Sequence, residues 1–218
     1  MWTLEETWGR EKMAATVYDF AVQNPVVGRV AALAMWGFDI RKLFASIECV
    51  ADTPRGSRVL DVPCGGGLVF SGLTLDHGLD YTALDYSPVM LERAHCKQEK
   101  LGLPGISFQQ GDVGALPYNN ASFDLALTYN GIHCFPDPRQ AVRELARVLK
   151  PGGTLRGTLV VRGAGLRYDA LIRLFILRGF FGPGCTRDEL AGWLDDNGLR
   201  LRSAEQSGAI LLFEAVKK

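Results

Sequence analysis

The sequence predicts an α/β fold in which one mostly parallel, doubly wound sheet carries helices on both faces. From Arg58 onward, short apolar or β-branched runs alternate with longer helical patterns, which is typical of parallel βαβ units. The last two strand patterns are separated only by a short turn, so we expect the sheet to end in an antiparallel hairpin. A length of 218 residues suits one large α/β domain. We therefore predict a single domain over residues 1–218 with a seven-stranded sheet.

The first fifty residues differ from the rest of the chain. Residues 1–50 show amphipathic helical stretches and no strand alternation, so we expect them to form an N-terminal helical cap. The strand patterns that follow define the core of the domain, residues 58–161. The five predicted strands of this core are 58–62, 81–85, 106–110, 124–129 and 154–161.

Two helices of the core have chemically marked starts. Ser87-Pro88 and Asp137-Pro138 each place a capping side chain before a proline, whose missing N–H group costs nothing in the first turn of a helix. Pro151-Gly152-Gly153 is expected to end the second helix. Apolar residues recur at helical spacing over 138–150 and should pack on the sheet; they are Val142, Leu145, Val148 and Leu149.

The C-terminal part contains an insertion and then a return to regular structure. Residues 163–185 are apolar and interrupted by glycines, and we interpret them as a lid over a site. Residues 186–218 should form a final helix and a hairpin. Thr186-Arg187-Asp188-Glu189 is a capping box that predicts a helix to about Asn197. Strands are expected over 199–206 and 209–216, with Ser207-Gly208 as the turn.

Composition excludes several classes of protein. Lys plus Arg equals Asp plus Glu, so no overall positive field attracts nucleic acid or an anionic membrane. The N-terminus lacks the pattern of a signal peptide, and no uncharged run approaches the ~20 residues that cross a bilayer, so stable membrane insertion is not expected. The five cysteines are scattered without metal-ligand spacing, which predicts a cytoplasmic protein with no metal site.

A glycine-rich turn follows the first predicted strand. Asp61 ends this strand, and Cys64-Gly65-Gly66-Gly67 forms the turn at the position of the nucleotide loop in a doubly wound sheet. Such a turn alone is weak evidence, because a tight connection without a ligand has the same composition. A nicotinamide fingerprint would need a third glycine where Phe70 stands, so a dinucleotide is disfavoured.

Two carboxylates follow the next strands. Asp85 ends the second strand about 20 residues after the glycines, where an acidic side chain accepts hydrogen bonds from ribose hydroxyls. Asp112 follows the third strand and should lie at the same edge of the sheet, although a plain turn residue is the alternative interpretation.

Together these stretches resemble class I S-adenosylmethionine-dependent methyltransferases, particularly the branch similar to ubiquinone/menaquinone-biosynthesis enzymes. The matching stretches, in family order and spacing, are VLDVPCGGG (59–67), ALDYSPVMLERA (83–94), GDVGALPYNNASFD (111–124) and RVLKPGGTL (147–155). The resemblance implies a Rossmann-like fold, S-adenosyl-L-methionine as cofactor, and residues 58–161 as the cofactor-binding core. It departs from the commonest family pattern at Pro63, which has no N–H group to donate.

The resemblance also implies a role for individual residues. Asp61, Cys64, Gly65 and Gly67 would hold the loop and the methionine portion of the cofactor, and Asn130 would offer its backbone to the ammonium group. Asp85 would bind both ribose hydroxyls. The residues expected around the adenine are Tyr86, Met90, Asp112 and Val113.

The methyl acceptor is expected between the two segments outside these motifs. Their apolar character predicts a small, apolar or aromatic acceptor, with Tyr18, Phe175 and Phe180 as wall residues. His133, just beyond the fourth strand, is the candidate general base and acceptor contact, and a packing role is its alternative. A protein that binds S-adenosylmethionine or S-adenosylhomocysteine without transferring methyl remains the alternative function. The sequence leaves the oligomeric state open.

Overall fold

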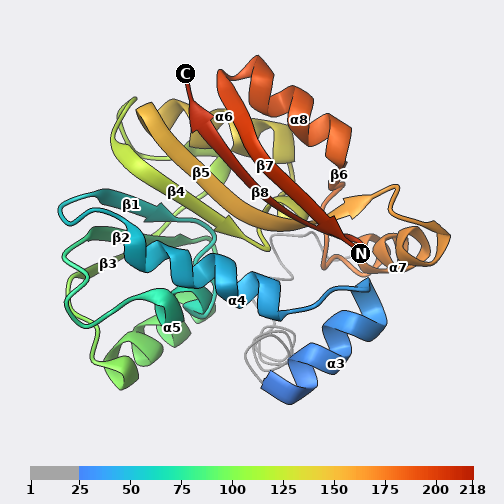
Figure 1. The fold of residues 1–218 in the computed structure, drawn as a ribbon, viewed down its shortest axis with the longest axis horizontal. Helices are drawn as coiled ribbons and strands as arrows, with labels where there is room; N and C mark the ends of the chain where they lie inside the picture. Colours follow the sequence, from blue (N-terminus) through green and yellow to red (C-terminus); the bar gives the residue numbers. More distant parts are fainter. Residues whose placement is uncertain (1–24) are drawn as a thin grey trace.

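The computed structural model describes residues 25–218, and its centre is one twisted sheet (Figure 1). The order of the main strands is β3-β2-β1-β4-β5-β8-β7, and β6 pairs with β5 beside this path. The strands are β1 Arg58–Asp61, β2 Asp80–Asp85, β3 Ile106–Gln110, β4 Phe123–Tyr129, β5 Leu149–Arg162, β6 Cys185–Thr186, β7 Leu199–Ser207 and β8 Ile210–Lys217. The helices are α3 Pro25–Trp36, α4 Arg41–Glu48, α5 Pro88–Leu101, α6 Pro138–Val148, α7 Leu166–Leu177 and α8 Arg187–Asp196.

The predicted fold class is confirmed. Strands β1 to β5 are parallel to one another, with Leu60 of β1 opposite Thr82 on one side and Ala126 on the other. β8 runs antiparallel to both β5 and β7, so the sheet ends in the expected hairpin. The seven main strands match the predicted number. The two-residue strand β6 adds an eighth that the sequence pattern did not reveal, because a pairing this short has no periodicity.

Each face of the sheet has its own apolar core. On one face, Val142 and Leu145 of α6 and Leu190 of α8 pack against buried residues of β4, β5 and β8. On the other face, Leu43 and Ile47 of α4 pack over β1 and β2 together with residues of the short helix η2, Leu68–Gly72. Burial of these side chains is the main term that stabilises the sheet against its helices.

The helix starts agree with the sequence. Ser87 accepts a hydrogen bond from the Met90 amide at 3.3 Å, and Asp137 accepts one from the Gln140 amide at 2.9 Å, each before a proline in the first turn. Thr186 and Glu189 form the complete capping box of α8. Side-chain caps thus fix where these helices begin.

One predicted boundary was wrong. The sequence placed the end of α6 at Pro151-Gly152-Gly153, but the helix ends at Val148 and β5 begins at Leu149. Leu149 pairs with Phe123, and the register then shifts so that Thr154 pairs with Leu125. Leu149 is therefore a strand residue, because it pairs with Phe123 and does not continue the helix. The Pro-Gly-Gly stretch forms an irregularity within β5.

Helices α3 and α7 lie together beside the C-terminal hairpin, as the right-hand side of Figure 1 shows. The Ala209 amide donates to the Trp36 carbonyl at 2.8 Å, which ties the end of α3 to the β7–β8 turn. Arg167 of α7 donates to the carbonyl of Ala34 at 3.2 Å. Among residues 25–218, no helix has both the length and the apolar character needed to cross a membrane.

Candidate functional site

The carboxyl ends of β1, β2 and β4 meet at one edge of the sheet. The Cys64 amide, in the loop after β1, donates to the Leu84 carbonyl of β2 at 2.9 Å. On the other side, Gly131 lies so close to Pro63 that a Cβ at this glycine would overlap the proline ring. The loop after β1 is therefore held between the ends of its two neighbouring strands, where parallel sheets bind their ligands.

Asp85 organises this edge. One of its carboxylate oxygens accepts a hydrogen bond from the Gly65 amide at 2.8 Å, and the other accepts from the Ser87 amide at 2.9 Å. Burial raises the pKa of Asp85 to about 6, against the lowering effect of these backbone donors. Because each carboxylate oxygen has two lone pairs, Asp85 keeps the capacity to accept further hydrogen bonds.

Two glycines of the loop have different roles. Gly65 has φ = 53°, and a Cβ there would meet no atom within 4 Å, so its backbone faces open space. Gly67 has φ = 79° and lies against the ring of Phe70, where a Cβ would overlap it. Both positions therefore need the left-handed conformation that glycine adopts at low cost. Gly65 offers bare backbone to a ligand, while Gly67 serves the packing of the loop.

Asp61 is a buried carboxyl group at the end of β1. One oxygen accepts a hydrogen bond from the Tyr81 hydroxyl at 2.8 Å, and its other oxygen, Oδ1, is buried without a partner. Burial raises the pKa of Asp61 to about 8. A buried acceptor without a partner is costly. A ligand that brings a hydrogen-bond donor or a cation to this oxygen would remove that cost.

The residues predicted around the adenine follow β2 and β3. Met90 is buried in the first turn of α5, whereas Tyr86 is exposed over 45% of its surface. Asp112 is exposed, and its Oδ1 accepts a hydrogen bond from the Gly114 amide at 2.7 Å, so it does form the turn that the alternative interpretation expected. Its second oxygen, Oδ2, is left for a ligand. Val113, the first residue of the short helix η3, is buried beside it.

Asn130 has a strained backbone immediately after β4. Its φ of 55° lies in the left-handed region, which is uncommon outside glycine. The conformation is held by Thr158, which accepts from the Asn130 amide at 2.8 Å through its carbonyl and donates to Asn130 Oδ1 at 2.9 Å through its hydroxyl. The backbone N–H group of Asn130 is thus engaged. Its carbonyl accepts only the weak thiol donor of Cys134, at 3.7 Å, and has a second lone pair that a ligand could use.

His133 is almost fully buried in the short helix η4, Ile132–Cys134. Its Nδ1 accepts a hydrogen bond from the Val160 amide at 3.2 Å, which places the proton of the neutral ring on Nε2. Burial lowers the pKa of His133 to about 3. A ring that is neutral and already uses its free lone pair is poorly suited to accept a proton. The geometry therefore disfavours His133 as a general base and leaves its Nε2–H group as a donor.

An aromatic cluster joins His133 to the two helices α3 and α7. The Phe181 ring lies 4.5 Å from the His133 ring and 5.1 Å from Phe175, between ring centroids. Phe175 in turn contacts Phe180 at 6.0 Å and Trp36 of α3 at 5.9 Å. Three of the predicted acceptor contacts therefore belong to one cluster, while Tyr18 lies outside the described residues.

The sequence prediction did not include three groups that contact His133 or the aromatic cluster. Trp36 ends an apolar helix and precedes Gly37, and this position could have suggested a contact. Phe181 was assigned to the lid but was not named as a wall residue. The Val160 amide carried no sequence signal, because any residue supplies the same backbone donor.

Known proteins that are similar in sequence to this chain are described as methyltransferases. Residues 60–156 match a family model described as a methyltransferase domain. The phthiotriol/phenolphthiotriol dimycocerosates methyltransferase of Mycobacterium leprae is 40% identical over 101 residues, which cover 46% of this chain and 36% of that protein. The 27-O-demethylrifamycin SV methyltransferase of Amycolatopsis mediterranei is 32% identical over 154 residues, 69% of this chain and 56% of that protein.

Solved structures share the fold. A SAM-dependent methyltransferase from Aquifex aeolicus superposes with a TM-score of 0.62 at 21% identity, over 86% of this chain and 93% of that one. The alignments to the curated relatives span between about a third and just over half of their lengths. These findings support a class I methyltransferase, and they do not separate the ubiquinone/menaquinone-like branch from others.

Proposed function

We propose that this chain, whose residues 60–156 form a methyltransferase domain, transfers the methyl group of S-adenosylmethionine to a small apolar or aromatic molecule. The observation that carries the proposal is the pairing of Asp85 with the open Gly65 loop at the carboxyl edge of β1 and β2. A carboxylate fixed beside bare backbone fits a ribose joined to a chain that must pass close to the protein.

The residues at this edge fit the proposed cofactor. Asp85 would accept hydrogen bonds from the ribose hydroxyls, and the unpartnered oxygen of Asp61 would meet the ammonium group with the Asn130 carbonyl. The cofactor supplies an activated methyl group on a positively charged sulfur. The remaining contacts would come from the loop residues Cys64, Gly65 and Gly67 and, around the adenine, from Tyr86, Met90, Asp112 and Val113.

The main task of the protein in methyl transfer is to align the reacting atoms. An in-line displacement needs the nucleophile, the methyl carbon and the sulfur held in a row, and it needs no covalent intermediate. We propose that His133 contributes by donating from Nε2 toward the acceptor molecule, because its Nδ1 is occupied by Val160. An acceptor hydroxyl would then be oriented by His133, with its proton leaving to solvent.

The acceptor class is inferred from the aromatic cluster. Trp36, Phe175, Phe180 and Phe181 are all partly exposed, and together with His133 they offer ring faces and one polar donor. Such a mixture suits an apolar or aromatic molecule with a single polar group. Two relatives are named as methyltransferases of phthiotriol/phenolphthiotriol dimycocerosates and of 27-O-demethylrifamycin SV, which are not nucleic acids or proteins.

Other sequence predictions remain proposals. The four ordered motifs support the ubiquinone/menaquinone-like branch. A net charge of zero supports a small-molecule acceptor rather than nucleic acid. All five cysteines are free, which supports a reducing cytoplasmic location.

Calorimetry tests the cofactor assignment. We expect S-adenosylmethionine and S-adenosylhomocysteine to bind in the micromolar range and NAD to give no heat. Turnover then separates the enzyme from a protein that only binds the cofactor. The chain is incubated with radiolabelled cofactor and either a quinol or a long-chain alcohol as the acceptor probe. Tight binding without label transfer to any apolar acceptor would favour the binding protein.

A further inference from the structure

Helix α7 is apolar around most of its circumference. Ile172 and Phe175 face the molecule, as expected for a helix that packs on a domain. The opposite side carries Leu166, Leu174 and Leu177, which are exposed over 92%, 45% and 63% of their surfaces. A surface helix normally presents charged or polar residues there. This face of α7 therefore lacks a partner within the part of the chain that the structure describes.

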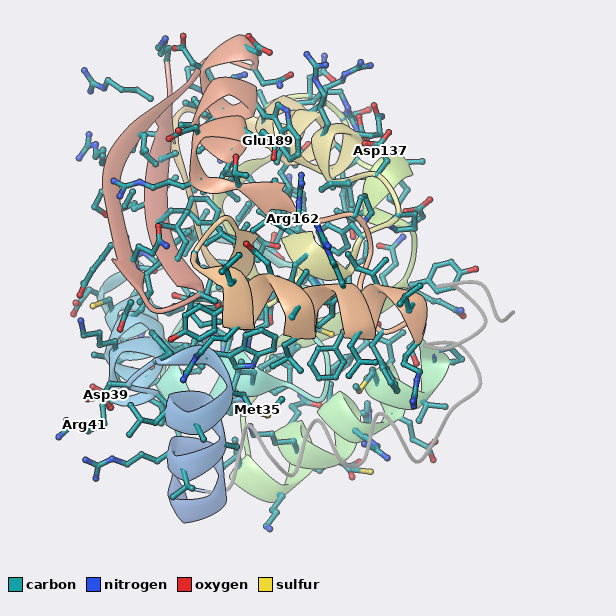
Figure 2. All side chains as sticks on the ribbon, turned by 90° about the vertical axis from the view of Figure 1, so that its right-hand side faces the viewer. Met35, Asp39, Arg41, Asp137, Arg162 and Glu189 are labelled. Carbon is teal, nitrogen blue, oxygen red and sulfur yellow. The ribbon has the colours of Figure 1, made fainter. Side chains whose placement is uncertain are left out.

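Helix α3 adds to the same side of the molecule. Val30 and Leu33 are exposed over 64% and 59% of their surfaces. The hydrogen bond from Arg167 to the Ala34 carbonyl holds the two helices together. Figure 2 looks onto this side, with α7 lying across it and α3 below. We call the exposed apolar residues of α3 and α7, with the arginines of both helices and Arg178 at the C-cap of α7, the cap face.

The cap face is also positively charged, although the whole chain is neutral. Among the described residues, two acids lie near these four arginines: Asp169, whose carboxylate accepts the Gly163 amide at 2.8 Å, and Asp39, which interacts with Arg29 and is ion-paired with Arg41. Arg173 and Arg178 are exposed and form no ion pair or side-chain hydrogen bond with a described residue. The arginines of the cap face are Arg29, Arg167, Arg173 and Arg178.

We propose that the cap face docks on the surface of an anionic lipid bilayer. Leucines at the boundary of the acyl chains and arginines that reach the phosphates are the pattern of a helix lying in the membrane interface. A symmetric contact with a second copy is less favourable, because it would bring two sets of four arginines together. Surface docking requires no spanning helix, and it does not depend on the proposed methyl transfer.

Vesicle flotation with the full chain tests the proposal. We expect the protein to float with vesicles of phosphatidylcholine and phosphatidylglycerol at 7:3, and much less with phosphatidylcholine alone. Binding should weaken when the salt is raised to 0.5 M, because the phosphate contacts are screened.

Two double variants probe the two components of the cap face. R173Q/R178Q should reduce binding about 25-fold, at about fivefold for each arginine. L174S/L177S should reduce it at least about tenfold, since less apolar surface is buried. The matched controls are R200Q/R202Q on β7 and L75S/L101S, which change exposed residues outside α3 and α7 and should leave binding unchanged. Unfolding midpoints measured for all variants check that each one keeps its fold, so that a loss of binding is not a loss of structure.

Three results would overturn the proposal. One is an absence of flotation with anionic vesicles. Another is equal loss of binding in the control variants, which would indicate non-specific adsorption. The third is a concentration-dependent dimer that L174S/L177S dissociates while vesicles bind nothing, because the cap face would then be a contact between copies.

Discussion

Single carboxyl groups dominate the chemistry of the candidate site. Asp61 and Asp85 end neighbouring strands and are both buried, so each pays a desolvation cost when it is charged. They differ in their partners. Asp85 has two backbone donors that stabilise its charge, whereas Asp61 has the Tyr81 hydroxyl and one oxygen without a partner. At neutral pH the site therefore holds one mainly charged and one mainly protonated carboxyl group.

Substitution of Asp85 should weaken cofactor binding more than substitution of Asp112. Asp85→Ala removes a charged acceptor for two hydroxyls, each worth about 1.5–3 kcal/mol, and it also releases the Gly65 amide. Asp85→Asn keeps one acceptor oxygen and should have an intermediate effect. Asp112→Ala should be milder, because Asp112 is exposed. Calorimetry with S-adenosylhomocysteine measures all three, and unchanged affinity in Asp85→Ala would refute the assignment at the end of β2.

Asp61 should make the cofactor-free protein less stable at higher pH. Its pKa rises from the ordinary 3.8 to about 8 on folding, so between these pH values the folded state holds a proton that the unfolded chain releases. The free energy of unfolding therefore falls as pH rises, by up to about 1.4 kcal/mol per pH unit. Asp61→Asn stays neutral and can still accept from Tyr81.

Urea denaturation at pH 5, 6.5 and 8 measures this effect. The stability advantage of Asp61→Asn over the natural chain should grow with pH, whereas the exposed control Asp52→Asn should show no such growth. A constant difference across this range would mean that Asp61 is already charged in the folded protein.

His133 should leave no mark on the pH profile of methyl transfer. Its pKa of about 3 keeps the ring neutral from pH 6 to 9, so we expect no ionisation of His133 in that range. His133→Asn should raise the KM for the acceptor while leaving the shape of the profile unchanged. A limb near pH 6.5 that disappears in His133→Asn would instead identify His133 as the general base.

At the scale of elements, α3 and α7 combine two tasks on opposite sides. Their inner sides meet in the aromatic cluster of Trp36, Phe175 and Phe181, next to His133 at the end of β4. Their outer sides form the cap face (Figure 2). The link from α3 to the β7–β8 turn fixes this unit on the sheet. The candidate cofactor residues and the aromatic cluster thus belong to different elements of the chain.

Truncation within the cluster should separate the two binding functions. Phe175→Ala removes ring contacts with Trp36, Phe180 and Phe181, and a buried aromatic truncation typically costs about 3–5 kcal/mol, less for this partly exposed ring. We expect weaker acceptor binding with nearly unchanged affinity for S-adenosylhomocysteine. Leu177→Ala, on the outer side of α7, is the matched control and should change neither. Loss of both affinities in Phe175→Ala would show that the cluster supports the core.

At the scale of the whole molecule, the glycine-rich loop after β1 lies between the two apolar cores, with Val62 in one and Cys64 in the other. The loop after β1 touches β2 through Leu84 and β4 through Gly131, and these strands belong to the centre of the sheet. A ligand held by this loop would bind only the folded chain. Binding should therefore stabilise the entire domain and not only the loop.

Thermal unfolding measures this coupling. With S-adenosylhomocysteine at 100 times its dissociation constant, we expect about 2.7 kcal/mol of added stability. For a chain of this size, that corresponds to a rise of about 5–10 °C in Tm. The Asp85→Ala variant should lose most of this rise. An equal rise in that variant would place the ligand elsewhere.

The local signals in the sequence were sufficient for the fold and for placing the candidate cofactor residues at one edge of the sheet. Strands β1 to β4 lie within one residue of their predicted bounds, because apolar alternation, caps and prolines act over a few residues. Asp61, Gly65, Asp85 and Asn130 were all predicted and lie at one edge, since the carboxyl ends of parallel strands converge. The parallel order of these strands is enough to bring the four residues to the same edge of the sheet.

Only the tertiary structure decided what depends on contacts distant in the chain. The proton position of His133 follows from the amide of Val160. The raised pKa of Asp61 follows from burial, which outweighs the lowering effect of the Tyr81 hydroxyl. The end of α6 was set by pairing of Leu149 with Phe123 rather than by the Pro-Gly-Gly stretch. The charge of the cap face is likewise invisible in a neutral composition. Burial, protonation and surface charge depend on which segments meet, and a linear pattern does not contain that information.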